Sequence, residues 1–564
     1  MKSFKIFPFS LSVILALQLS LPACVDLEET LYSEIVPDTY VTGQEQLNSI
    51  VASTYVWFRL AATDRKWYSA SELAADQIVG VAKDNGAGSY DGGRQVELHW
   101  HKYSQTNECL ESAWDVWTKL IAGSNLNIDI FQEADYEMIG LTEADRKRHI
   151  AEAMMLRAIG FFELMDMFGN IPAPEDIYVD LPEQRTPQQV FEMIDRDIKE
   201  YTQYLPKGWN ASTYGRITQA AAKMLQMRLY FNAANYGMPE HWTECRDICR
   251  SIINGEYGNY ELAKTFYEPF DWNNDTSKEI VLGVSMDETL TGRPEIFYTW
   301  NHRGARDFYG LGYRGNNQLG LSPSKDPAGN DYNFQHKLGT PFKHYDKKDL
   351  RVSEPANPDK ANGGGMFLYG EMKSKLGSAK GEKEYNKQVI SLVDQVARFA
   401  SGKDPAQLES TVMHGEENSC YRWNRYRIYA SAEVSKYFKY DYVWMRLSEV
   451  YYTLAECMLR LGEAGYSQWV NQVKKRNFNE GDFVPYTDAT LDLDELLCDR
   501  GREFIGESLR RRDLIRYGYF NLPWWDKDAS SPLKKIFPIP PKALFSNTKL
   551  VQNEGYSSAS GIEE

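Results

Sequence analysis

Two stretches of the sequence combine flat aromatic rings with hydrogen-bonding side chains, residues 90–103 and 297–317. Aromatic rings can stack on the apolar faces of pyranose sugars, while amides and guanidinium groups bond the hydroxyls. Both stretches are rich in glycine, and we expect them to be loops. Aromatic packing beneath a glycine-rich loop is the alternative. The side chains predicted to bind ligand are Arg94, Trp100, Tyr298, Trp300, Arg303, Tyr309 and Tyr313.

No catalytic motif accompanies these rings. The sequence has no H-E-x-x-H, P-loop or G-x-S-x-G pattern. The G-x-G-x-x-G match at Gly310–Gly315 follows no apolar strand and opens no helix, so it does not indicate a dinucleotide site. Acidic pairs such as Asp346 and Asp349 are frequent, but the carboxylate separation that a glycoside hydrolase needs is spatial. We predict a non-catalytic protein without metal or cofactor, and a surface glycoside hydrolase is the alternative.

The first residues indicate export and lipidation. Lys2 and Lys5 precede the apolar stretch 7–21, which is too short to span a membrane and is typical of a signal peptide. The sequence LPAC at 21–24 resembles a bacterial lipobox, in which cleavage precedes the cysteine and its thiol is then acylated. Several acyl chains on Cys24 would anchor the protein firmly. An ordinary secretory signal with a chance cysteine is the alternative.

The composition predicts a folded globular protein and excludes one large class of partner. Of the 564 residues 43% are hydrophobic and 13% aromatic, enough for a sizeable core. The formal net charge is −16 and no basic run is present. This argues against nucleic acid and against a polybasic contact with anionic lipid. The six cysteines after Cys24 show no CxxC spacing, so neither a zinc site nor a disulfide framework is indicated.

Helix signals bracket an irregular middle. Thr142 with Asp145, and Thr186-Pro187 with Gln189, have the spacing of capping boxes before apolar residues at helical steps. From residue 255 glycine, proline, asparagine and tyrosine crowd in, and helical periodicity returns at Tyr442. We divide the chain into a signal peptide (1–23), a lipidated tether (24–41), an N-terminal helical part (42–254), an irregular ligand-binding insertion (255–432) and a C-terminal helical part with the tail (433–564).

The segment Asp499–Gly518 mixes a ladder of charges with residues that need burial. Its charged residues recur at three- and four-residue steps, so on one continuous helix they line a single face with mostly alternating sign. Phe504, Leu514 and Ile515 supply the apolar side. We predict one helix here. Spacing alone favours a solvated face.

Four segments in chain order resemble the SusD/RagB family of surface lipoproteins, which capture nutrients for a TonB-dependent transporter. They are AEAMMLRAIGFFELMDMFGNIP, WMRLSEVYYTLAECMLRLGEA, DRGREFIGESLRRRDLIRYG and IFPIPPKALFSNTKLVQNEGY. Two departures lie in the third segment. Ser508 stands where the family usually has glycine, and Arg511-Arg512 replace an aromatic pair.

The resemblance implies both a fold and a function. The expected fold is mainly α, a tetratricopeptide-like helical scaffold under a large irregular layer, and the charged segment 499–518 becomes a structural clamp between helices. The expected function is capture of oligosaccharide at the outer membrane, where the lipid-anchored protein faces the exterior. The expected partners are a glycan and a SusC-like TonB-dependent outer-membrane transporter. A purely structural subunit of the transporter complex is a further alternative.

Overall fold

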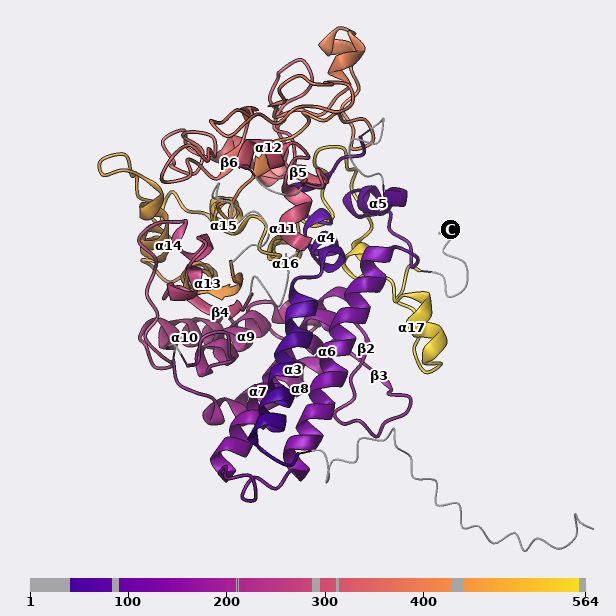
Figure 1. The fold of residues 1–564 in the computed structure, drawn as a ribbon, viewed down its shortest axis with the longest axis vertical. Coiled ribbons are helices and arrows are strands. Elements are labelled where there is room, and N and C mark those ends of the chain that lie inside the picture. The colour runs from indigo at the N-terminus through magenta and orange to yellow at the C-terminus, as the bar shows by residue number, and fades with distance from the viewer. Residues whose placement is uncertain are drawn as a thin grey trace, which may run out of the picture.

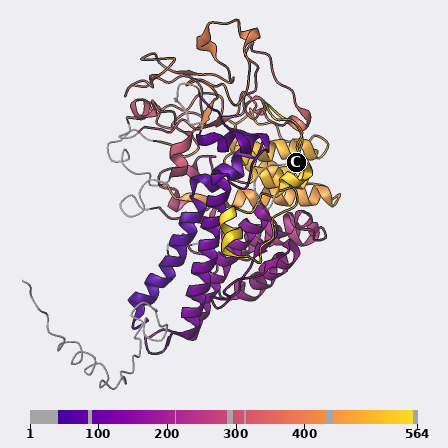
Figure 2. The same cartoon turned by 90° about the vertical axis from the view of Figure 1, so that its right-hand side faces the viewer.

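The computed structural model describes residues 41–83, 91–208, 210, 212–286, 295–310, 314–428 and 440–556. Long helices form the scaffold, and a loop-rich layer covers one end of it (Figure 1). Seen from the side, the same long helices run lengthwise below that layer (Figure 2). This confirms the predicted mainly α architecture with an irregular layer. The boundaries of the five parts stay a prediction.

The scaffold is a row of helices in which each packs against the next. Contacts run in the order α3, α6, α7, α8, α9, α10, α13 and α14, as in a solenoid whose units bury their faces only against neighbours. In the described residues the helices are α3 Gln44–Ala62, α4 Arg65–Leu73, α5 Arg94–Trp100, α6 Glu108–Glu133, α7 Glu143–Phe168, α8 Pro187–Tyr201, α9 Gln219–Phe231, α10 Trp242–Ile253, α11 Glu295–Trp300, α12 Ala305–Tyr309, α13 Leu447–Arg460, α14 Ser467–Lys474, α15 Leu493–Phe504, α16 Arg510–Tyr517 and α17 Pro541–Ser546.

Local capping fixes where two of these helices begin. The Thr142 hydroxyl accepts from the Asp145 N–H at 3.2 Å, and the Asp145 carboxylate accepts from the Thr142 N–H at 3.0 Å. Thr186 and Gln189 form the same reciprocal box at the start of α8. Both boxes were predicted from the sequence and are confirmed, because the pattern is local and needs no tertiary partner.

The strands are short and pair antiparallel. β4 Ile280–Val284 pairs with β10 Tyr442–Arg446 across the seam between the irregular layer and the C-terminal helices. The other pairs are β1 Ile78–Gly80 with β5 Leu319–Leu321, β2 Ile171–Pro172 with β3 Gln184–Arg185, β6 Phe367–Leu368 with β9 Arg422–Trp423, and β7 Gly370–Glu371 with β8 Ser391–Leu392.

Segment 499–518 is not one helix. α15 ends at Phe504 and α16 begins at Arg510, because Gly506 (φ +78°) and Ser508 (φ +58°) both adopt the left-handed region. The Ser508 N–H, turned inward by this break, donates to the buried Glu72 carboxylate at 2.5 Å. The prediction of a continuous helix was therefore wrong. The family's glycine at position 508 would adopt this φ without strain.

The solvated-face interpretation is also wrong, and the clamp is confirmed. Arg511 Nη1 lies 2.9 Å from Asp166 Oδ2, and Arg512 Nη2 lies 2.5 Å from Glu163 Oε2. All four side chains are buried. Arg511 and Arg512, which replace the aromatic pair, thus bind α16 to two acids one helical turn apart on α7.

A second buried network joins the C-terminal helices to the irregular layer. Glu503 Oε1 accepts from Arg446 Nη1 at 2.7 Å and from Arg476 Nη2 at 2.6 Å, and its Oε2 lies 3.3 Å from Arg351 Nη1. The charges balance, which is what permits so many to be buried. The eight members are Arg351, Arg425, Arg446, Arg476, Glu279, Asp349, Glu503 and Glu507.

Both stretches that were expected to be loops contain helices in their described residues. Helix α5 lies within 91–103, and the end of α11 and all of α12 lie within 297–310. Gly93 (φ +88°) and His101 (φ +54°) close α5 at both ends, so its seven residues are too few for a readable helical period. Among the described residues, no helix has both the length and the apolar character needed to cross a membrane.

Candidate functional site

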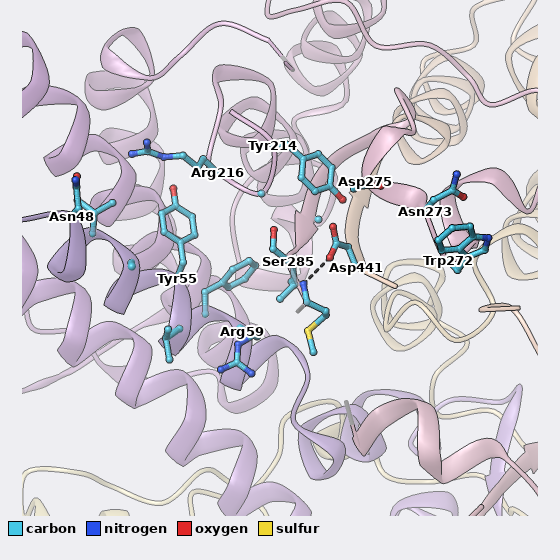
Figure 3. A pocket seen from close by; sticks show the side chains of 18 residues that line it. Asn48, Tyr55, Arg59, Tyr214, Arg216, Trp272, Asn273, Asp275, Ser285 and Asp441 are labelled. Atoms are coloured by element: carbon cyan, nitrogen blue, oxygen red, sulfur yellow. Dashed lines mark hydrogen bonds between the residues drawn. The ribbon is translucent and has the colours of Figure 1, made fainter. Parts of the chain in front are cut away.

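A cavity of about 970 Å³ opens between α3, the turn before α9 and the β4–β10 pair (Figure 3). We call it the Tyr55 pocket. Its wall combines rings, amides and charged groups from five segments far apart in the chain. The members with polar side-chain atoms are Asn48, Tyr55, Arg59, Tyr214, Arg216, Trp272, Asn273, Asp275, Ser285 and Asp441.

Tyr55 is held rigidly by the helix behind it. Its hydroxyl donates to the Glu152 carboxylate of α7 and accepts from the Ile217 N–H at 3.0 Å. Burial, together with the neighbouring Glu152 charge, raises the pKa of Tyr55 well above its ordinary value, so the phenol stays protonated. Arg216 forms a bidentate pair with Glu152, at 2.7 and 3.0 Å. The charge of Arg216 is thus balanced inside the wall.

Asp441 and Tyr214 form the opposite side. The Met286 N–H donates to Asp441 Oδ1 at 2.7 Å (Figure 3). Burial raises the pKa of Asp441 to about 6, although Tyr214 and the Met286 N–H oppose the shift. Gly215 (φ +72°) brings the Tyr214 turn close, because a Cβ there would lie 2.3 Å from Ser285 Oγ.

The mouth of the pocket is open and polar. Trp272 is 46% exposed, and Asn273 and Asp275 beside it are also exposed. Arg59, at the end of α3, is half-buried, and no carboxylate of the described residues pairs with it. The pocket therefore offers three rings, an unpaired guanidinium donor, and amide and carboxylate groups. This is the inventory that a polyhydroxylated ring requires.

Trp100, predicted as a ligand residue, lies in a different place. It ends α5, is half-buried, and donates from its indole N–H to Asp526 Oδ2 at 3.2 Å. It lines a second cavity of about 1250 Å³ between the end of α5 and the segment 523–534. We call this cavity the Trp100 groove. Arg94, at the other end of α5, pairs with the exposed Glu108 at 2.6 Å.

Trp300 and Tyr309 are buried, with exposures of 4% and 1%. The Trp300 ring stacks on Tyr68 at 5.7 Å and lies 4.6 Å from the Trp423 ring. This placement favours the alternative of aromatic packing beneath the loop. Their role in ligand binding is untested and finds no support in this burial.

The remaining predicted residues are only partly described. Arg303 lies 3.6 Å from Glu382 at the edge of the irregular layer. Tyr298 belongs to α11, but its side chain is outside the description, as are Tyr313 and Cys24. Of the predicted ligand residues whose side chains are described, Trp100 and Trp300 therefore line different pockets.

Sequence reasoning missed the Tyr55 pocket for identifiable reasons. Tyr55 falls on the apolar stripe of α3, a position that is typical of a core residue. Tyr214, Trp272 and Asp441 stand far apart in the chain and reveal nothing individually. The run Trp272-Asn273-Asn274-Asp275 was the available signal, since it joins a ring to amides outside any helical period. In the part of the chain that the structure describes, no group of three or more His, Cys, Asp or Glu is placed to hold a metal ion.

Two family models together match most of the sequence. The model of the SusD family matches residues 255–532, and a SusD-like model described as "Starch-binding associating with outer membrane" matches 27–231. The chain belongs to the SusD family. The resemblance read from the four segments is thereby confirmed.

Individual SusD relatives agree with this assignment. Starch-binding protein SusD of Bacteroides thetaiotaomicron is 24% identical over 526 residues, covering 87% of this chain and 85% of that protein. Surface glycan-binding protein A from B. thetaiotaomicron, solved with laminarihexaose, superimposes with a TM-score of 0.65 at 17% identity and covers 91% of this chain and 100% of its own. NanU of B. fragilis gives a TM-score of 0.68 at 18% identity, with coverage of 93% and 99%. The structural likenesses establish a shared fold.

Proposed function

We propose that this SusD-family protein captures oligosaccharides at the cell surface and passes them unaltered to a SusC-like TonB-dependent outer-membrane transporter. The observation that carries the proposal is the Tyr55 pocket, where an exposed tryptophan and two fixed tyrosines face hydrogen-bonding groups across an open cavity. The relatives are consistent with this role, since one is named a starch-binding protein and another was solved with laminarihexaose.

The pocket divides the work of binding between its two sides. A sugar face can stack on Trp272 at the mouth, where the ring is solvated in the free protein and gains contact on binding. Arg59 and Asn48 donate to hydroxyl oxygens, and Asp275 accepts from hydroxyl hydrogens. Because Arg216 is already neutralised by Glu152, it contributes shape more than charge.

Truncation of Trp272 tests this placement. Aromatic anchors that a ligand covers on binding are worth on the order of 2 kcal/mol, so Trp272→Ala should weaken oligosaccharide binding about thirtyfold. The melting temperature of the variant should be nearly that of the wild type, because the ring is already 46% exposed. A glycan array identifies the oligosaccharides that bind, and titration calorimetry measures their affinity.

Two variants serve as controls. Phe545→Ala removes an 85% exposed ring of α17 and should change neither affinity nor melting. Trp300→Ala removes a core ring and should cost about 3 to 5 kcal/mol of folding free energy. Unchanged affinity in Trp272→Ala would refute the pocket as the glycan site, and an array without any glycan bound would refute capture itself, leaving a structural subunit.

One observation favours a second function. Asp275 and Asp441 line the same pocket, and a carboxyl whose pKa is raised to about 6 is suited to act as a general acid in glycoside hydrolysis. Incubation of the protein with a fluorescently labelled glycan that binds it, followed by chromatography, separates the two functions. Binding without release of shorter sugars supports capture, whereas cleavage that Asp441→Asn abolishes would establish the hydrolase.

We further propose that a lipid on Cys24 anchors the protein to the outer membrane, facing outward. The family model's description places its members in association with the outer membrane. Cys24→Ala should release the protein from membranes, and protease added to whole cells should remove the wild type. Solubilised native membranes should yield a co-purifying barrel transporter. Retention of Cys24→Ala in a strain without that transporter, or repeated purification of this chain alone, would contradict the respective proposal.

A further inference from the structure

The Trp100 groove contains a buried ammonium group without a balancing charge. Lys527 is 4% exposed and lines the groove. Its Nζ donates to the carbonyl oxygens of Leu522 (2.9 Å) and Asp528 (3.1 Å), and it lies 3.9 Å from the centre of the Trp524 ring. No carboxylate of the described residues lies within ion-pair distance of this nitrogen. Buried lysines are normally paired with an acid, so the Lys527 ammonium is suited to bind an anionic group of a ligand.

One of the two acids that flank Lys527 in the chain already has hydrogen-bond donors of its own. Asp526 Oδ2 accepts from Thr411 Oγ1 at 2.7 Å, from the Val412 N–H at 2.6 Å and from Trp100 Nε1 at 3.2 Å. These donors hold its charge against the floor of the groove. The turn itself is strained, because Asp526 has φ +51°. Strained backbone conformations persist where surrounding contacts hold the residue in place, and they are frequent at ligand-binding sites.

Two further lysines and several rings complete the surface. Lys534 is 8% exposed with its Nζ 4.6 Å from the Tyr556 ring centre, and Lys102 lies over the Trp100 ring at 5.4 Å. Three lysines thus line the groove together with Asp526 and the exposed Asp528. This gathering of lysines contrasts with the formal charge of −16 on the whole chain.

We propose that the Trp100 groove is a second ligand site, distinct from the Tyr55 pocket, that binds an oxyanion-bearing sugar with its carboxylate or sulfate group on Lys527 and its ring along Trp100. The inference extends the proposed glycan capture to acidic glycans. Uronic acids and sulfated sugars present the same chemistry, an oxyanion on a pyranose, and the lysine cluster suits both. The groove, at about 1250 Å³, holds more than one sugar unit.

The protonation state of Lys527 supplies a second signature. Burial lowers its pKa to about 7, although the charges of Asp528 and Asp76 oppose the shift. His99 and His101 of α5 also lie near it, and burial lowers their pKa values so that they stay neutral. Asp76 is itself paired with Arg510, and Lys102, Lys534 and Asp526 line the same groove. An anion needs the ammonium form, so affinity should fall as the pH rises from 6 to 9.

The experiment compares three sugars by titration calorimetry on the full-length protein. Trigalacturonate and lactose 3′-sulfate are the carboxylate and sulfate probes, and maltotriose is the neutral one. We expect one or both acidic probes to bind, more tightly at pH 6 than at pH 9. Lys527→Met should weaken that binding about 10- to 100-fold, the range for a charge-assisted hydrogen bond. Lys119→Met, which removes a 59% exposed lysine of α6, should leave it unchanged.

Two more variants keep the outcome decisive. Asp528→Asn removes an exposed like charge from the rim and should tighten binding of the acidic probe about threefold to tenfold. In a Trp272→Ala background, Lys527→Met should still weaken binding of the acidic probe, which separates this groove from the Tyr55 pocket even if neutral glycans bind nowhere. The proposal is overturned if neither acidic probe binds, or if Lys527→Met and Asp528→Asn both leave the affinity of the acidic probe at the wild-type value.

Discussion

Glu503→Gln should strongly destabilise the protein. The substitution keeps the shape of the side chain and removes one negative charge from between Arg446, Arg476 and Arg351, which approach it at 2.7, 2.6 and 3.3 Å. Burial by itself opposes ionisation of Glu503, but the three guanidinium groups outweigh it and lower its pKa. The variant therefore leaves one excess positive charge in a balanced, buried network.

Breaking a buried ion pair by removing one partner costs about 3 to 5 kcal/mol, since the other charge stays buried and uncompensated. Roughly 2.1 cal/mol/K of unfolding entropy per residue gives a chain of this length an entropy on the order of 1 kcal/mol/K. The melting temperature should thus fall by about 3 to 5 °C, measured by scanning calorimetry at pH 7. Urea denaturation measures the corresponding loss of unfolding free energy.

Glu261→Gln is the matched control. Glu261 pairs with Lys278 at 2.7 Å, but both side chains are more than half exposed, and such a pair is worth at most about 1 kcal/mol. If Glu503→Gln and Glu261→Gln have the same melting temperature, the buried network does not stabilise the fold. A loss of stability confined to Glu503→Gln supports a stabilising role for the buried network around Glu503.

Two further stability predictions follow from strained or desolvated groups. Ser508→Gly should stabilise the protein by about 1 kcal/mol, because glycine adopts φ +58° without the side-chain clash that serine suffers. Urea denaturation measures the change. A loss of stability would contradict the explanation of the break between α15 and α16. Burial raises the pKa of Glu72 to about 7 in the folded protein, whereas in the unfolded chain Glu72 ionises near 4.5. The ionised form therefore favours the unfolded chain. The free energy of unfolding should drop by about 3 kcal/mol as the pH rises from 4.5 through 7. Glu72→Gln should therefore melt above the wild type at pH 8 and close to it at pH 4, and an equal difference at both values would rule out this titration.

The features that the sequence predicted correctly are local. The capping boxes at Thr142 and Thr186 depend on residues three positions apart, and periodic apolar faces locate the long helices. Family resemblance supplied the solenoid architecture, which no clean repeat length revealed. The break at Gly506 escaped notice because the charged residues keep their three- and four-residue spacing straight through it. Only the partners, on α7 and near α4, show that these charges are buried.

The binding surface was harder to predict because it is built from distant segments. Glycine, asparagine and arginine around Trp300 suggested an exposed ring, yet Tyr68 and Trp423 cover it. Composition does not reveal whether a loop folds outward or inward. Trp100 does face a cavity, but with lysines of the C-terminal segment, whose proximity depends on the complete fold.

The contacts between α7 and the last tenth of the chain constrain the order in which the protein can fold during synthesis. Glu163 and Asp166 receive their cations from Arg511 and Arg512, and the Phe537 N–H donates to the Met167 carbonyl at 2.8 Å. In a helical solenoid folding can otherwise begin in any repeat and propagate to its neighbours, including repeats that emerge early in synthesis. Here a nascent chain ending before residue 510 would have to bury two carboxylates without the arginines that balance their charge, which opposes close packing around α7 until the final residues emerge. Completion of the fold is thereby coupled to completion of the polypeptide.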